Sequence, residues 1–221
     1  SHRAYVAGLQ RMLIADTNIG EIASMKISAS EPVERNRPNT GPADWPELQE
    51  RATKLLRFPQ GGDFGSRFQA LHEELLRHTT QTPDATVLAL IYLSAQETRL
   101  YSATHAMLVS CVCMLTAREV LNWPEAKVLT LGRAALSMNL AMTELQDQLV
   151  QQAHPLTATQ IAAVENHATR SEALLRHLGV ADPVWLEAVR CHHHRLPGPL
   201  NEKTEAQQIA RLIQRADIFA A

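Results

Sequence analysis

The amino-acid sequence predicts an all-α protein, a bundle of helices preceded by a helical accessory region. Glycine is scarce, with 9 among 221 residues, and aromatic residues make up 5% of the chain. Strong helix formers such as Ala, Leu, Gln, Glu and Arg dominate the sequence. No run alternates apolar and polar residues as a half-buried strand does. The chain is long enough for one core, or for one core and a small second domain.

The accessory region is expected to occupy residues 1–95, and its clearest feature is a proline-rich stretch at residues 31–46. This stretch holds four prolines. Because proline lacks an N–H and clashes with the preceding helical turn, we expect a loop or linker here. A second irregular stretch is expected at residues 58–65, which contain one proline and three glycines.

Capping residues place the next two helices. Ser66, with Gln69 three residues later, matches a capping box and predicts a helix that reaches about His78. Asp84 is expected to cap the following helix, which would end near Ser94.

A long apolar segment at residues 97–121 predicts a helix that stops before Pro124. Residues 125–151 continue the helical pattern, with a break near Asn139. Cys111 and Cys113 lie within the apolar segment, and we expect both to be small buried residues of its helix.

Three later helices carry capping residues at their starts: Thr157 with Gln160, Asp182 with Pro183, and Thr204 with Gln207. The first should end at His177, with Gly179 just beyond its end. The second should end between Cys191 and His194. Short connections between these helices are typical of a helical bundle.

Composition excludes several classes of function. The formal net charge is −2, and no basic surplus is clustered as a nucleic-acid partner would require. We expect no membrane span, because no stretch approaches the roughly 18 apolar residues that one needs. Three cysteines without zinc spacing argue against a disulfide framework. With no signal-peptide pattern either, these features predict a cytoplasmic protein.

Histidine is frequent, with ten residues, and its placement suggests a metal site. Taken singly, a histidine in an apolar helix is usually a core residue with a hydrogen-bond partner, and an aspartate there usually lies at a boundary. Imidazoles and a carboxylate from separate helices can instead converge on a metal in a bundle core. The candidate metal ligands are His105, His167, His192, His193 and Asp217.

Five segments, in matching order and spacing, resemble the HD-GYP branch of the HD phosphohydrolases. They are YSATH, ending at His105; LGRAALSMNLAM, similar to AALLHDIGK; PLTATQIAAVENH, similar to PLTPEE…KxHP; VRCHHHR, similar to xxxHHER; and IARLIQRADIFAA, similar to ILAVADVYDAL. The resemblance implies that residues 96–221 form a helical domain of the HD type. Members of this family are metal-dependent phosphodiesterases of bacterial cyclic di-GMP signalling.

The departures from the family pattern fall on its chemistry. Met138 and Asn139 stand where the family has its His-Asp pair, and Met142 stands where it has a lysine. The upstream glutamate falls on Tyr101, and the glutamate after the histidine pair falls on His194. The GYP element is replaced by Leu-Pro-Gly-Pro-Leu at residues 196–200.

These replacements predict that the family's reaction is absent or severely reduced. In the family, the aspartate of the pair bridges two metals, and bridging needs an anionic oxygen pair. Asn139 offers only one neutral amide oxygen, and Met138 a soft thioether that suits Mn, Fe(II) or Mg poorly. We therefore expect a non-catalytic or impaired regulatory module. The expected partners are a cyclic dinucleotide, a signalling protein or a second copy in a homodimer.

Three alternatives remain open at this point. His167, His192 and His193 could hold one divalent transition metal (Zn, Fe, Mn or Ni), which would leave a phosphohydrolase with an altered, mononuclear site. The same histidines could instead bond to one another and to Asn139 without a metal. A helical scaffold unrelated to this family would leave the candidate ligands scattered.

Overall fold

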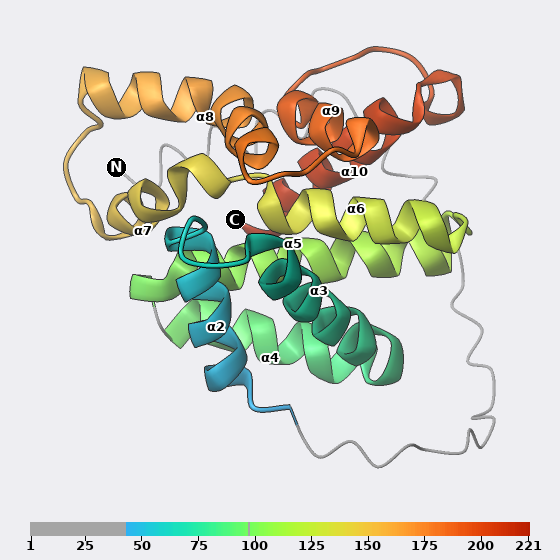
Figure 1. Ribbon diagram of the computed structural model, residues 1–221, viewed down its shortest axis with the longest axis horizontal. Helices are drawn as coiled ribbons and strands as arrows, with labels where there is room; N and C mark the ends of the chain where they lie inside the picture. The colour runs from blue at the N-terminus through green and yellow to red at the C-terminus, as the bar shows by residue number, and fades with distance from the viewer. Residues whose placement is uncertain (1–42, 97) are drawn as a thin grey trace. The chain divides into compact units, whose positions relative to one another are not determined.

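The computed structural model describes residues 43–96 and 98–221, which are drawn as ribbon in Figure 1. In this part of the chain the regular secondary structure is helical and includes no strand. The prediction of an all-α protein is therefore confirmed for these residues. Their contacts group Asp44–Gln152 with Leu156–Ala221 in one compact unit, which holds the helices of the described residues.

The first helices of this unit are α2 (Trp45–Arg57), α3 (Phe64–Gln81) and α4 (Pro83–Gln96). Most of the predicted proline-rich loop lies outside the described residues. Its last proline, Pro46, belongs instead to the first turn of α2, where a missing N–H costs nothing because that group has no helical partner.

The prediction of a capping box at Ser66 was wrong, because an aspartate three residues earlier takes the capping role. The carboxylate of Asp63 accepts a hydrogen bond from the backbone N–H of Ser66 at 3.3 Å. The side chain of Gln69 turns away and donates to Glu73. Asp84 likewise lies inside the first turn of α4 and does not precede it, since this helix begins at Pro83.

The remaining helices follow the predicted order. They are α5 (Tyr101–Leu115), α6 (Glu125–Ser137), α7 (Thr143–Gln151), α8 (Ala158–His177), α9 (Pro183–Cys191) and α10 (Glu205–Ala220). A π-helical turn, Thr116–Val120, extends α5. The expected break falls between α6 and α7 at Asn139. The capping boxes of α8 and α10 and the Asp182 cap of α9 are all present, which confirms those predictions.

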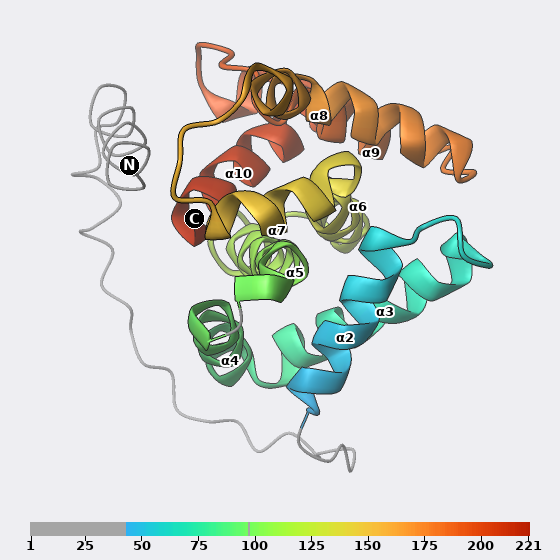
Figure 2. The same cartoon turned by 90° about the vertical axis from the view of Figure 1, so that its left-hand side faces the viewer.

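Helix α5 lies at the centre of the unit. It packs against α2, α3, α4, α6, α7 and α10, and Figure 2 shows it nearly end-on among these neighbours. Twelve of its residues are buried. Cys111 and Cys113 are among them, as expected, and both are free thiols. Because α2, α3 and α4 pack on α5, the contacts draw no boundary between compact units at residues 95 and 96.

Each polar side chain on the buried faces of α5 reaches a different helix. Ser102 and the carboxylate of Asp147 on α7 share two hydrogen bonds, of 2.7 and 2.9 Å. Thr104 accepts from the Gln49 amide of α2 at 2.6 Å. The Ser110 hydroxyl donates to a backbone carbonyl of α6 at 2.9 Å. His105 bonds to α10 at 2.8 Å. These bonds fix the rotation of α5 about its axis, since a buried polar group left without a partner is costly.

The segment Thr98–Val120, which contains α5, departs from the expectation that no stretch of the chain matches a membrane span. Its 23 residues include a window with a mean hydropathy of 1.5, so it meets the length and composition expected of a membrane-crossing helix. Within the fold, 72% of that window is buried. Burial of this extent is what a core helix shows, and it explains why nearly every face of α5 is apolar.

A close approach of α6 to α3 and α5 encloses His72. A Cβ atom at Gly132 of α6 would lie 2.6 Å from His72 Nε2 and 2.7 Å from Met114 Sδ, so only glycine fits there. His72 is fully buried, and neither ring nitrogen has a hydrogen-bond partner. Burial, and to a lesser degree the positive charge of Arg133, lowers the pKa of His72 to about 4.

This buried imidazole should make the fold acid-sensitive. The unfolded chain binds a proton at His72 below about pH 6.5, whereas the folded chain binds it only near pH 4. Stability therefore falls as the pH drops through this window, by about 2 kcal/mol between pH 7 and pH 5. Replacing the side chain in His72→Leu should remove this part of the pH dependence and leave stability at pH 7 nearly unchanged. Urea unfolding at both pH values measures it, and an equal acid loss in the variant and the wild type would contradict it.

Candidate functional site

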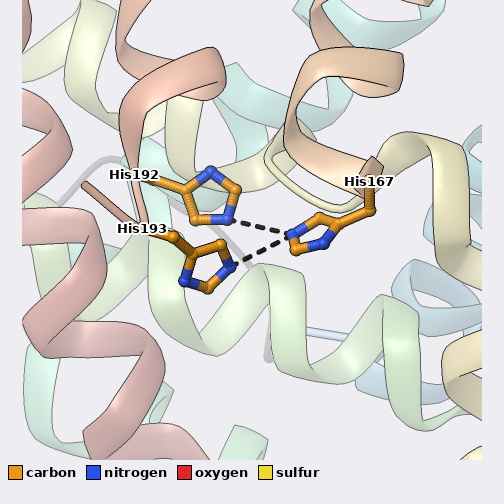
Figure 3. Close-up of side chains that lie close together, drawn as sticks. All are labelled: His167, His192 and His193. Carbon is orange, nitrogen blue, oxygen red and sulfur yellow. Dashed lines mark hydrogen bonds between the residues drawn. The ribbon is translucent and has the colours of Figure 1, made fainter. Parts of the chain in front are cut away.

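Three of the predicted ligands converge between α8 and α9. His167 lies in the middle of α8, and His192 and His193 follow the last residue of α9. Figure 3 shows the three rings pointing toward one another. His167 Nε2 lies 3.2 Å from His192 Nε2 and 3.2 Å from His193 Nε2. One ring nitrogen of each residue lies within 4.8 Å of the others.

Backbone carbonyls hold two of these rings from behind. His167 Nδ1 lies 2.5 Å from the carbonyl oxygen of Val164, and His192 Nδ1 lies 2.6 Å from that of Val189. A carbonyl only accepts, so both Nδ1 atoms must carry a proton and donate. The sequence analysis did not predict these contacts, although the carbonyl three residues earlier lies within reach of a histidine in a helix.

Because the Nδ1 atoms of His167 and His192 carry the protons, a neutral cluster has no proton between the two Nε2 atoms. Neutral His167 and His192, protonated on Nδ1, both present an Nε2 lone pair. His193 can donate its own Nε2 proton to His167, which satisfies that contact. At the His167–His192 contact, however, two lone pairs face each other across 3.2 Å. A hydrogen bond there requires one ring to be a cation.

Burial works against an imidazolium in this place. Burial lowers the pKa of His192 to about 3, helped by the neighbouring His193. It also lowers the pKa values of His167 and His193, the latter with a contribution from His167. His192 is fully buried, whereas His193 is exposed and leaves one side of the cluster open.

The donor set fits one divalent transition metal. Imidazole nitrogens suit Zn, Fe and Ni, and two nitrogens bound tetrahedrally to one zinc lie roughly 3.3 Å apart. The two separations of 3.2 Å match that spacing. A histidine whose other ring nitrogen donates to a backbone carbonyl is also the usual arrangement around a bound metal. His167, His192 and His193 would hold the ion.

The other two predicted ligands form a separate pair beside this cluster. His105 Nε2 on α5 donates to the Asp217 carboxylate of α10 at 2.8 Å. The phenol of Tyr101 lies 3.3 Å from His105 Nδ1, the nitrogen that is then free to accept. Burial opposes ionisation of Asp217, but the His105 hydrogen bond and the nearby imidazoles outweigh it and lower the pKa of this carboxyl.

Met138 and Asn139 are not part of the histidine cluster. Met138 is fully buried and belongs to the hydrophobic core. The Asn139 amide donates to Gln146 Oε1 at 3.3 Å, and within the described chain no hydrogen bond joins it to a histidine. The alternative in which the histidines bond to one another and to Asn139 is therefore correct for the contacts among the histidines and wrong for Asn139. His194, which stands at the position of the family's glutamate, is exposed.

The candidate ligands are not scattered, because three histidines converge and Asp217 lies close enough to influence their pKa values. Comparisons add no relative: no family model, no curated protein and no solved structure significantly matches this chain. The site therefore has to be interpreted from its own geometry.

The cluster should bind one equivalent of Co²⁺ or Zn²⁺. Metal-free protein is titrated with Co²⁺, and a visible absorption band of tetrahedral Co²⁺ is expected to saturate near one equivalent. His167→Ala and His192→Ala should weaken binding by about 10-fold or more, because each removes one ligand. His177→Ala, an exposed histidine at the end of the same helix α8, is the matched control. Binding that survives in His192→Ala would show that the metal lies elsewhere.

Proposed function

We propose that this chain is an HD-GYP-like regulatory module of the HD type, in which hydrolysis of cyclic di-GMP is absent or severely reduced. The proposal rests on Met138 and Asn139, the two positions that correspond to the family's His-Asp pair. A core methionine and an amide that faces Gln146 occupy them. Neither supplies the anionic oxygen pair that bridging two metals requires.

The pairing of His105 with Asp217 supports the same conclusion. In the family resemblance both residues belong to the metal site that uses the His-Asp pair. Here the imidazole N–H is directed at the carboxylate, at 2.8 Å. The two side chains satisfy each other, so this half of the site needs no metal to balance it.

The other part of the candidate site, the cluster of His167, His192 and His193, would hold a single metal. A metal there would act as a Lewis acid and lower the pKa of a bound water. The lysine of the family pattern, which would help to neutralise a phosphodiester, falls on Met142. A single ion therefore leaves the two negative charges of cyclic di-GMP with little to balance them, and binding without turnover fits the site better.

One observation favours a second candidate, a mononuclear metal-dependent phosphohydrolase. The cluster is open at His193, and three imidazoles with one free position form the ligand set of a catalytic zinc. Asp217 lies close enough to influence the pKa values of all three histidines, and it could act as a proton acceptor.

The ligands and partners of the module stay predictions. A cyclic dinucleotide and a signalling protein are the expected partners, with a homodimer as the expected assembly. Nucleic acid and membranes are not expected partners. The cytoplasm is the expected compartment, since the three cysteines lie free and buried in the described fold.

Turnover measurements separate the two candidates. Wild-type protein loaded with Mn²⁺, Fe²⁺, Zn²⁺ or Ni²⁺ should hydrolyse neither cyclic di-GMP nor a panel of nucleotides and phosphodiesters above background. His192→Ala, prepared identically, gives the background of contaminating enzymes. A rate that His192→Ala abolishes would reject the regulatory proposal and establish the mononuclear enzyme.

Restoring the family pair should add a second metal. Met138→His/Asn139→Asp would restore the imidazole and the carboxylate of the family pattern, and histidine is close to methionine in volume. We expect bound metal, measured by elemental analysis, to rise from about one equivalent to about two. Met138→Leu/Asn139→Asp, which restores only the carboxylate, is the control. No gain in the full double variant would show that the residues behind the ligands no longer support this metal position.

A further inference from the structure

A cleft of about 290 Å³ lies on a different part of the unit from the histidine cluster. It is bounded by the start of α3, by Arg133 of α6, and by the connection between α8 and α9. None of the candidate metal ligands lines it. Sequence reasoning did not identify this cleft, because its walls come from three segments that are far apart along the chain.

The guanidinium of Arg133 lies in this cleft without a partner. Its Nε atom is buried and has no hydrogen bond, and the side chain forms no ion pair with any carboxylate in the described chain. Two other partly buried arginines do pair with a carboxylate, Arg57 with Asp147 at 2.7 Å and Arg118 with Glu125 at 2.9 Å. Guanidinium carries five N–H donors in a planar fork that matches a carboxylate. A cation that the fold leaves uncompensated is therefore open to an anion from outside.

Asp182 is the only acidic residue that lines the same cleft, and its charge is already engaged. Its Oδ1 atom accepts the backbone N–H groups of Val184 at 2.9 Å and Trp185 at 3.2 Å. This carboxylate also sits at the positive end of α9, where the helix dipole stabilises it. It therefore competes only weakly with a ligand for Arg133, from which it is separated by more than an ion-pair distance.

The remaining wall is aromatic. Phe68 lies between Phe64 and Trp185, with ring centroids 5.2 Å from each. The indole N–H of Trp185 already donates to Ser137 Oγ at 2.9 Å, so this wall offers a ligand mainly apolar surface. Flat apolar groups pack well against such rings.

We propose that this cleft binds a small organic carboxylate with a flat apolar body, whose charged end pairs with Arg133 and whose body lies against Phe64, Phe68 and Trp185. The volume suits a ligand of about ten to fifteen non-hydrogen atoms. The proposal does not depend on the function of the histidine cluster. Its ligand would nevertheless touch the segment that joins α8 to α9, the two helices that carry the histidines.

Three probes of equal size and different charge test the proposal: phenylacetate, 2-phenylethanol and the phenethylammonium ion. Binding to the full chain is followed by amide chemical shifts of residues 178–182. Phenylacetate should bind with a dissociation constant on the order of millimolar, as expected for so few atoms. The alcohol and the ammonium ion should bind at least about 10-fold more weakly, since a charge-assisted pair is lost.

Substitution of the arginine should remove this preference for negative charge. In Arg133→Met, phenylacetate should bind about 10-fold more weakly, while 2-phenylethanol binds as it does to the wild type. Arg133→Lys, which keeps the charge but not the fork, should lie between the two. Arg170→Met, at an exposed arginine of α8, is the control and should leave binding unchanged.

A separate unfolding measurement guards against a structural role of Arg133. Because the guanidinium lacks a partner, Arg133→Met should be at least as stable as the wild type without ligand. The proposal is overturned if phenethylammonium binds as tightly as phenylacetate, if Arg133→Met binds phenylacetate like the wild type, or if no probe shifts the cleft amides. It is equally overturned if Arg133→Met is strongly destabilised, because the arginine would then serve the fold.

Discussion

Burial of α5 on nearly every side is the constraint on which the rest of the structure depends. A helix surrounded by six others has no solvent face on which to place a polar group. Each hydroxyl and imidazole that the sequence retains there must therefore find its partner in a neighbouring helix. The bonds of Ser102, Thr104 and His105 meet this requirement in α7, α2 and α10. The same requirement positions the candidate site, because it fixes which face of α10 turns inward with Asp217.

The two halves of the histidine-rich region differ in how fully they are satisfied, and this difference carries the functional argument. His105 and Asp217 form a complete donor–acceptor pair, so nothing in their geometry calls for a ligand. His167 and His192 do not form such a pair. A backbone carbonyl fixes each ring in the tautomer whose Nε2 carries no proton. The His105–Asp217 pair is thus closed by internal pairing, whereas the contact between His167 and His192 would be satisfied by a bound cation.

Sequence reasoning succeeded where the determining interactions are local. The caps at Thr157, Asp182 and Thr204 depend on residues within one turn, and all three were placed correctly. It failed at Ser66 because Asp63, a stronger acceptor, competes within the same turn. Periodicity alone could not bring the histidines together, and only the order of the resembling segments suggested that they meet. The orientation of the Asn139 amide toward Gln146 and the unpaired charge of Arg133 depend on contacts between distant segments, for which the sequence carries no local signal.

A cation bound between His167 and His192 would also have a mechanical consequence. These two residues belong to α8 and to the end of α9, and the connection between the helices contains Gly179, held at φ +90°. An ion bound to both nitrogens would join the helices at a second point and restrict the connecting segment from both ends. That segment forms one wall of the Arg133 cleft. A metal at the histidines and an anion at the arginine would therefore act on the same short stretch of backbone. Each ligand would order this stretch, so the second ligand to bind would lose less conformational entropy. The two ligands would then bind cooperatively.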